Sequence, residues 1–231
     1  PGNVQALNGY SLAPSISADA LRVAFESYSN TLATGSAAGD TNNTVDIFVK
    51  DRNSDAVIRV MADIDDSRTG LQPNGTGLRP AISGDGRFVA FESDATNLAV
   101  PTSLTIPAPG IYRVYRAALD SSSVLRNKFA SFSSDGTPTH GTRASINHDG
   151  SAVSYEAYNQ VYIATLDPPG VLSSSAPYVT HVSRTPSGEG SADGESYAHS
   201  SLAPVLSGQQ FVVWSSSAGN LSITQPEALN Y

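Results

Sequence analysis

The sequence predicts an all-β protein made of repeated four-stranded units. One hairpin motif recurs about every 65 residues along the chain, and two further short strands follow each of the first three copies. Apolar and polar residues alternate in these strands, whereas no window of about 11 residues shows the period of an amphipathic helix. Together these observations indicate a repeat protein built from antiparallel sheets.

The repeated hairpin is clearest in residues 14–27 and 80–93, which match almost without interruption. A third copy covers residues 144–156. A fourth, more divergent copy covers residues 201–214 and is one residue shorter through its turn. The copies divide the chain into repeats with the approximate bounds 10–66, 76–130, 140–184 and 198–231.

Each copy has the chemistry of a β-hairpin. A short apolar strand reaches an Asp-Gly pair or its equivalent, and a strand of β-branched and aromatic residues follows. Gly86 and Gly150 supply the positive φ that such turns need. Ala20 stands in the glycine position of the first copy, so we expect that turn to be distorted or of another type.

A second pair of short alternating strands follows the hairpin in the first three repeats. The expected pairs are 46–51 with 57–60, 111–116 with 124–126, and 160–164 with 178–182. The fourth repeat offers a single candidate for this pair, residues 220–224.

Four strands per repeat at this spacing are typical of a β-propeller blade. One such sheet cannot bury both faces alone, but blades packed face to face around an axis bury them and limit exposed edges. We therefore expect residues 1–231 to form a single β-propeller domain with four blade-like repeats of four antiparallel strands. This domain is either a small closed propeller or part of a larger one.

One aromatic position recurs in all four hairpins. A carbohydrate-stacking surface is one interpretation, but repetition in every blade favours a core between blades. The residues at this position are Phe25, Phe91, Tyr155 and Trp214.

The hairpin motif resembles a known bacterial repeat. Residues 83–91 read Ser-Gly-Asp-Gly-Arg-Phe-Val-Ala-Phe, and residues 46–52 within the segment 40–52 read Asp-Ile-Phe-Val-Lys-Asp-Arg. Both segments resemble the TolB-like, WD40-like (PD40-type) β-propeller repeat, strongly in the first two repeats and weakly in the last. The resemblance implies a propeller with a binding role, and it implies no catalytic residues because this repeat is structural.

Charge and composition exclude several classes of partner. The formal net charge is −8, from 21 acidic residues against 13 Lys and Arg, which argues against nucleic acid and anionic lipid as partners. No apolar run approaches the roughly 18 residues of a membrane-spanning helix. The absence of Cys excludes disulfides and thiolate metal sites. A composition rich in Ser, Thr, Asn and Gly favours a bacterial protein that is secreted, extracellular or periplasmic.

The loop before residue 47 contains a candidate cation site. Asp40, Asn42 and Asp46 place oxygen ligands along one loop, and calcium prefers several such ligands. The EF-hand pattern is absent, since the loop has neither its glycine nor its closing glutamate. The alternative is an Asx-rich turn whose side chains bond to their own backbone. Calcium is therefore the candidate cofactor, and both interpretations stay open.

Two other acidic clusters are interpreted as loops without a ligand. The first is interpreted as a solvated connecting loop. The second is interpreted as a mobile loop, because its glycine-rich segment is poorly preorganised for a metal or for acid–base chemistry. The first cluster consists of Asp63, Asp65 and Asp66, and the second of Glu189, Asp193, Glu195 and His199.

The sequence lacks a hydrolase signature. No Gly-x-Ser-x-Gly elbow follows an apolar strand, and the superficially similar residues 190–194 follow no strand. No pair of the four histidines has a metal-ligand spacing such as His-x-x-x-His. Arg79 and Arg143 precede corresponding strands in the second and third repeats and are interpreted as structural.

The leading functional hypothesis is a non-catalytic exported interaction module or scaffold that presents blade-end loops to a protein or glycan partner. The alternatives are a structural subunit of an extracellular assembly or filament, and a glycan-active propeller enzyme with paired carboxylates in a cleft. Because the fourth repeat has no evident outer strand, we also expect residues 4–7 to pair with the region 221–224. That pairing would lie within the chain or on a neighbouring subunit.

Overall fold

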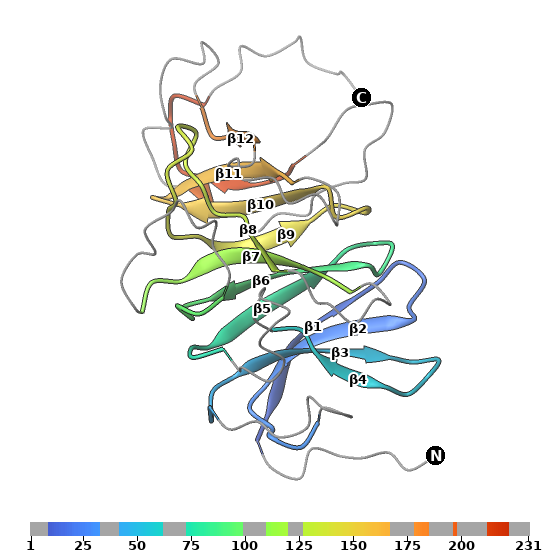
Figure 1. The fold of residues 1–231 in the computed structure, drawn as a ribbon. Coiled ribbons are helices and arrows are strands. Elements are labelled where there is room, and N and C mark those ends of the chain that lie inside the picture. The colour runs from blue at the N-terminus through green and yellow to red at the C-terminus, as the bar shows by residue number, and fades with distance from the viewer. Residues whose placement is uncertain are drawn as a thin grey trace.

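Over the residues that it describes, the computed structural model contains three four-stranded antiparallel sheets and one two-stranded sheet (Figure 1). This confirms the expected all-β class with propeller-type blades. The residues that it describes are 9–32, 42–61, 73–98, 110–119, 127–166, 178–184, 196–197 and 212–221.

Each of the first three repeats folds as one blade, with its strands hydrogen-bonded in chain order. The first blade consists of β1 (Ser11–Ile16), β2 (Arg22–Ser27), β3 (Asp46–Asp51) and β4 (Val57–Arg59). The second consists of β5 (Gly77–Ile82), β6 (Phe88–Ser93), β7 (Arg113–Ala118) and β8 (Asn127–Phe129). The third consists of β9 (Thr142–Ile146), β10 (Ala152–Ala157), β11 (Gln160–Thr165) and β12 (Tyr178–His181).

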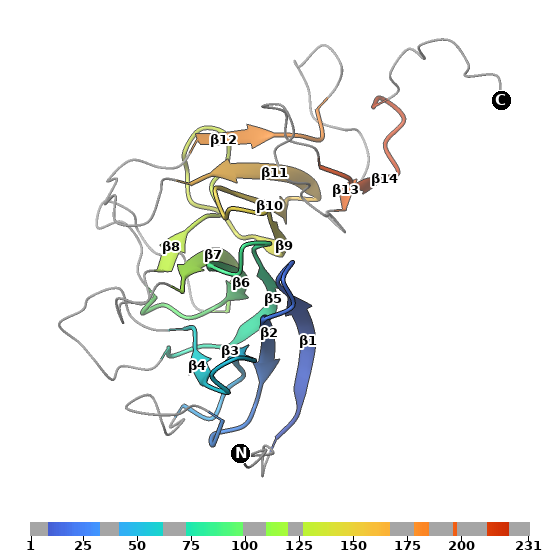
Figure 2. The ribbon, with the colours of Figure 1, turned by 90° about the vertical axis from the view of Figure 1, so that its right-hand side faces the viewer.

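Successive blades pack face to face with their first strands adjacent. Strand β1 contacts β5, and β5 contacts β9, so these three strands form the inner row of the blades. Figure 2 shows this inner row on one side and the outer strands β4, β8 and β12 on the other. This is the arrangement expected for blades around a propeller axis.

Every inner strand carries the same irregularity. The pairing register with the second strand shifts between Leu12 and Ser15 in the first blade and between Leu78 and Ala81 in the second. A corresponding shift separates Ser154 and Glu156 on β10 in the third blade. The residue inside each bulge has a positive φ: 49° at Ala13, 48° at Arg79 and 52° at Arg143. A bulge of this kind redirects a side chain out of the regular pleat.

The recurring aromatic position lies in the core between blades at Phe91 and Tyr155, as the sequence predicts, whereas Trp214 is only half-buried and directly precedes β14. Phe91 and Tyr155 are both 0% exposed. Each stacks on an aromatic partner from the next strand, with ring centroids 5.7 Å apart for Phe91 and Tyr115 and 5.8 Å for Tyr155 and Tyr162. Phe25 is only half-buried, because the described residues place no blade in front of the first one.

The turn around Ala20 differs from our expectation. Ala20 has φ 58°, close to the 71° of Gly86 and the 72° of Gly150. Its N–H donates to the Ser17 carbonyl at 2.9 Å, just as the Gly86 N–H donates to the Ser83 carbonyl. The predicted distortion is therefore wrong: alanine accepts the left-handed conformation, and the turn is the same.

One strand of the second blade begins later than predicted, because β7 starts at Arg113 instead of residue 111. Strand β8 is described over Asn127–Phe129, whereas the predicted strand 124–126 lies outside the described residues. Pairing with β6, in which Ser93 lies opposite Arg113, sets the start of β7.

The fourth repeat is described only in part. Strand β13 (Ser196–Tyr197) pairs antiparallel with β14 (Ser215–Ser216), and β13 lies in the segment that we interpreted as a mobile loop. The Ser196 N–H also donates to the Asn159 carbonyl, which ties β13 to the third blade. Residues 4–7, 201–211 and 222–224 lie outside the described residues, so the complete fourth blade and the terminal pairing remain predictions.

Among the described residues, no helix has the length and hydrophobicity needed to cross a membrane.

Candidate functional site

Three equivalent turns line one end of the blades. They are residues 17–21, 83–87 and 147–151, and we call them the turn row. Each follows the inner strand of its blade and leads into the second strand. Because loops at the ends of blades are exposed on a rigid scaffold, the turn row is the first candidate for a binding surface.

Serine and aspartate fix the shape of the first turn. The Ser17 hydroxyl donates to Asp19 Oδ1 at 2.6 Å, and the Leu21 N–H donates to the same oxygen at 2.9 Å. The hydrogen bond from Ser17, together with that from the Leu21 backbone, lowers the pKa of Asp19. Asp19 is therefore charged over an even wider pH range than an ordinary aspartate.

The second and third turns use the same chemistry. The Ser83 hydroxyl donates to Asp85 Oδ1 at 2.6 Å, and the Arg87 N–H donates to that oxygen at 3.0 Å. In the third turn, Asp149 Oδ1 accepts from the Ser151 hydroxyl at 2.7 Å. Burial acts to raise the pKa of Asp149, but the hydrogen bonds that it accepts, those from Ser151 foremost, together outweigh burial, so the pKa is lowered.

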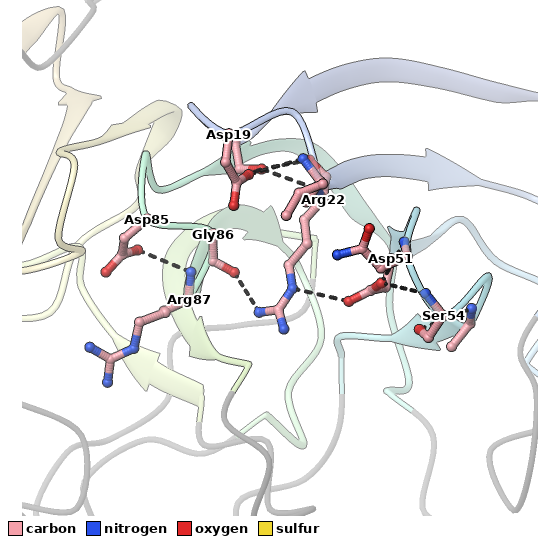
Figure 3. Close-up of polar contacts among 11 residues, drawn as sticks. Asp19, Arg22, Asp51, Ser54, Asp85, Gly86 and Arg87 are labelled. Carbon is pink, nitrogen blue, oxygen red and sulfur yellow. Dashed lines mark hydrogen bonds and ion pairs between the residues drawn. The ribbon is translucent and has the colours of Figure 1, made fainter.

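Backbone hydrogen bonds join each turn to the next. The Ala18 N–H donates to the Gly84 carbonyl at 2.9 Å, and the Asp85 N–H donates to the His148 carbonyl at 2.9 Å. The Arg22 guanidinium reaches across to the Gly86 carbonyl at 2.8 Å (Figure 3). The turn row is thus one connected polar structure rather than three separate loops.

Arg22 also connects the turn row to the next turn of its own blade. Its Nε lies 3.5 Å from Asp51 Oδ2, as Figure 3 shows. The Ser54 N–H donates to Asp51 Oδ1 at 2.9 Å, and this backbone contact helps to lower the pKa of Asp51. Both groups are partly exposed, so the pair contributes more to orientation than to stability.

A second set of charged residues joins the blades beside the inner strands. We call Glu26, Arg79, Glu92, Arg143 and Glu156 the junction ladder. Each glutamate is on the second strand of a blade, and each arginine occupies the bulge of an inner strand.

The ladder alternates between contacts within a blade and contacts across blades. The Arg79 guanidinium donates to Glu92 Oε2 at 2.6 Å, and Arg143 donates to both oxygens of Glu156, at 3.0 and 2.7 Å. Across blades, the Arg79 N–H donates to Glu26 at 2.7 Å and the Arg143 N–H donates to Glu92 at 2.5 Å. The two arginines are therefore structural, as the sequence analysis proposed.

The predicted calcium ligands are only partly described. Asp40 lies outside the described residues. Asn42 accepts the Thr44 N–H at 3.1 Å, which is the contact of an Asx turn, and its amide donates to the Pro73 carbonyl at 2.7 Å. Asp46 is 1% exposed and pairs with Arg59 at 3.3 Å. Calcium binding by this loop remains a prediction.

The other predicted clusters give no site in the described part of the chain. Residues 63–66 and 189–195 and His199 lie outside it. Within the described ranges, no group of three or more His, Asp or Glu is placed to hold a metal ion. His148 is exposed, and its ring lies against Gly84, so it packs at the joint between the second and third blades.

The sequence analysis missed two features that were visible in the sequence. Residues 133–137 repeat the Ser-x-Asp-Gly pattern between β8 and β9, and there Asp135 accepts from the Ser133 hydroxyl and the Thr137 N–H. These hydrogen bonds, that from Ser133 foremost, lower the pKa of Asp135 to about 2. The glutamates of the junction ladder also recur at one position of the hairpin, which an alignment of the copies displays.

The sheets, the row of inner strands and the repeated joints define a protein of the β-propeller class. Similar solved structures include TolB from Acinetobacter baumannii, with a TM-score of 0.41 and 16% identity, over 94% of this chain and 42% of that one. Another is a putative TolB from Agrobacterium tumefaciens, with a TM-score of 0.40 and 17% identity, over 76% and 59% of the two chains.

A third similar structure is KlAtg21 in complex with the coiled-coil of AgAtg16, with a TM-score of 0.45 and 13% identity, over 90% and 50% of the chains. The chain thus spans about half the length of these structures. The overlaps are loose and the identities low, so no activity or partner is transferred from them. No protein-family model matches the sequence, and no curated protein matches it.

Proposed function

We propose that this chain is a non-catalytic interaction module, exported from the cytoplasm, that binds a protein or glycan partner through the turn row. The observation that carries the proposal is the fixed shape of this exposed surface. Backbone hydrogen bonds link the three turns, and serine–aspartate contacts hold each turn in place. Preorganisation of this kind reduces the entropy lost on binding.

The exposed side chains of the turn row suit a polar partner. They combine two carboxylates, a guanidinium, an imidazole and one aliphatic group. They belong to Asp19, Leu21, Arg87, His148 and Asp149.

The buried carboxylates support a non-catalytic role. Glu92 and Glu156 are each held by an arginine of their own blade, which is a structural use of the charge. The glycan-active alternative needs a pair of carboxylates that face a cleft and a bound sugar.

Glycan and peptide arrays can test the proposal. We expect the wild type to bind a defined subset of probes, and the triple variant Asp19→Ala, Arg87→Ala, Asp149→Ala to lose that binding. The triple variant should still unfold in one cooperative transition, at a melting temperature lowered by the loss of the serine–aspartate contacts. The matched control is Tyr178→Ser on β12, where an equally exposed side chain lies away from the turn row. Binding that survives the triple variant would contradict the proposal, and cleavage of a bound glycan would favour the enzyme alternative.

The alternative of a structural subunit has one observation in its favour. Ile16, on the outward face of the first blade, is 56% exposed, whereas its equivalents Ile82 and Ile146 are each 7% exposed behind a preceding blade. An uncovered apolar sheet face is a natural site for self-association.

A further inference from the structure

The same arginine–glutamate contact of the junction ladder occurs in the second and third blades. In each, the glutamate of the second strand receives the guanidinium of the arginine in the bulge of its own inner strand. Arg79 reaches Glu92 in this way, and Arg143 reaches Glu156 with both carboxylate oxygens engaged. The pairing balances the buried charge with a partner of matching shape.

The first blade keeps the glutamate but lacks the arginine. Ala13 occupies the bulge of β1 with φ 49°, the same backbone conformation as Arg79 with φ 48°. Leu12 pairs in register with Glu26, as Leu78 pairs with Glu92, so the positions correspond residue for residue. The methyl group of Ala13 cannot reach the carboxylate, so the bulge of this blade supplies no guanidinium to Glu26.

Glu26 is therefore a buried carboxylate with a position left open. It is 8% exposed, and among the described residues it receives one hydrogen bond, from the Arg79 N–H to Oε2 at 2.7 Å. Burying a charge without a full set of partners is costly, so this position favours an incoming cation.

The open position is accessible from solvent. Ala13 is exposed, and Leu12, directly across the strand pair from Glu26, is 53% exposed. A basic side chain that entered here could lay its aliphatic stem on Leu12 and place its charged end on Glu26. The equivalent pairs in the other blades show that a guanidinium fits this geometry.

We propose that Glu26 and the open position beside Ala13 form a binding site for the guanidinium group of an arginine side chain on a peptide partner. This inference rests on the proposed function only in its biological role, since an interaction module would use such a site for an anchoring residue. The chemistry of the site stands on the junction ladder alone.

The experiment is a titration of the ¹⁵N-labelled chain with N-acetyl-arginine amide, followed by NMR. The reporter is the Arg79 N–H, because it already donates to Glu26 and so senses any new charge on that carboxylate. We expect a saturable shift with a Kd on the order of millimolar for this single group. N-acetyl-citrulline amide has nearly the same shape without the charge and should produce no saturable shift.

Two variants define the site. Glu26→Gln removes the charge and should abolish the shift. Ala13→Arg supplies the missing guanidinium from within, so it should also abolish the shift and raise the melting temperature by roughly 2–4 °C. Asp135→Asn, which alters an exposed carboxylate between β8 and β9, should leave the titration unchanged.

The proposal is overturned if the Arg79 N–H does not respond, or if its response persists in Ala13→Arg. A response to the citrulline compound of equal size would also overturn it. Failure here leaves binding through the turn row intact, and failure of the turn-row variants leaves this titration unaffected, so the two proposals can be separated.

Discussion

Glu92 is a residue at which burial and charge oppose each other. Its side chain is fully buried, and this burial raises its pKa above the ordinary 4.5, although the Arg79 guanidinium and the Arg143 N–H favour the charged form. A carboxyl group whose pKa is higher in the folded state binds a proton more readily there than in the unfolded chain. Its contribution to stability therefore increases as pH falls through the folded-state pKa, and it levels off below the unfolded-state value.

Replacement of Glu92 by Gln tests this sign. Glutamine keeps the shape but cannot titrate, so the wild type should gain stability relative to Glu92→Gln between neutral pH and about pH 4. Urea denaturation at several pH values measures the difference in free energy of unfolding. If the wild type instead loses stability relative to Glu92→Gln as the pH falls, the arginine contacts outweigh the burial of Glu92.

Phe91 tests the core between the first two blades. Phe91→Ala should lower the free energy of unfolding by about 3–5 kcal/mol, because Phe91 is fully buried and stacks on Tyr115. Phe25→Ala at the equivalent, half-buried position is the matched control and should cost clearly less. Equal losses would mean that the face of the first blade is covered in solution.

At this scale the sequence predicted the aromatic core but not the charged joints. Phe91 and Tyr155 could be identified because a large apolar residue that recurs in every hairpin has few other uses. Glu92 could not be paired with Arg143, since the contact depends on a bulge whose positive φ at an arginine has no sequence signal.

At the scale of elements, the hairpin turns show how one backbone conformation tolerates different residues. Ala20→Gly should stabilise the chain by about 1 kcal/mol, because alanine with φ 58° carries a left-handed strain that glycine lacks. Gly150→Ala should destabilise it more strongly, since a Cβ there would lie 2.2 Å from the Phe88 ring.

A second glycine separates the effect of backbone strain from that of packing. Gly110 has φ 83°, and a Cβ added there would meet no heavy atom within 4 Å, so Gly110→Ala measures backbone strain alone. In thermal unfolding, the melting temperature of Ala20→Gly should lie above that of the wild type and that of Gly110→Ala below it. Gly150→Ala should have the lowest melting temperature. A different order would contradict the assignment of strain and packing.

The loop before β3 carries the calcium prediction. If Asp40, Asn42 and Asp46 bind calcium, EDTA should lower the melting temperature and Asp46→Ala should abolish that sensitivity. Asp46 also pairs with Arg59, so Asp46→Ala costs stability whether or not a metal binds. Asp40→Asn is therefore the sharper variant. An unchanged melting curve in EDTA leaves only the Asx turn.

The bounds of elements were less predictable than their existence. Strand β7 begins two residues later than expected, at Arg113. Pairing of Ser93 with Arg113 sets the true start, and that register depends on the partner strand. Strand β13, at Ser196–Tyr197, has no apolar alternation and could not be recognised at all.

At the scale of the whole molecule, the outward face of the first blade differs from the corresponding faces behind it. Arg52 directly follows the third strand of the first blade. Leu119 and Leu166 hold the same position after the third strands of the other two blades, because the backbone N–H of each of these three residues donates to the carbonyl of the last residue of a turn in the turn row. Both leucines are buried, whereas Arg52 is exposed. The face therefore combines exposed apolar residues near the inner strand with charge farther out, as terminal repeats often do.

The last prediction concerns what completes the row of blades. The fourth repeat is expected to lack an outer strand, and residues 4–7 have no place within the first blade, so we expect these residues to pair with the region 221–224. Figure 2 shows β13 and β14 beside the third blade and away from the first one, and this separation makes pairing on a neighbouring subunit the form to test first. Sedimentation velocity should then reveal an oligomer that grows with concentration and is lost when residues 1–9 are removed.

Proline at Val4 and Ala6 should have the same effect as this truncation, because proline cannot donate to a strand ladder, while serine at both positions should preserve association. A monomer at all concentrations, with protected amides in residues 4–7, would instead establish closure within the chain. Free hydrogen exchange of those amides would exclude both forms.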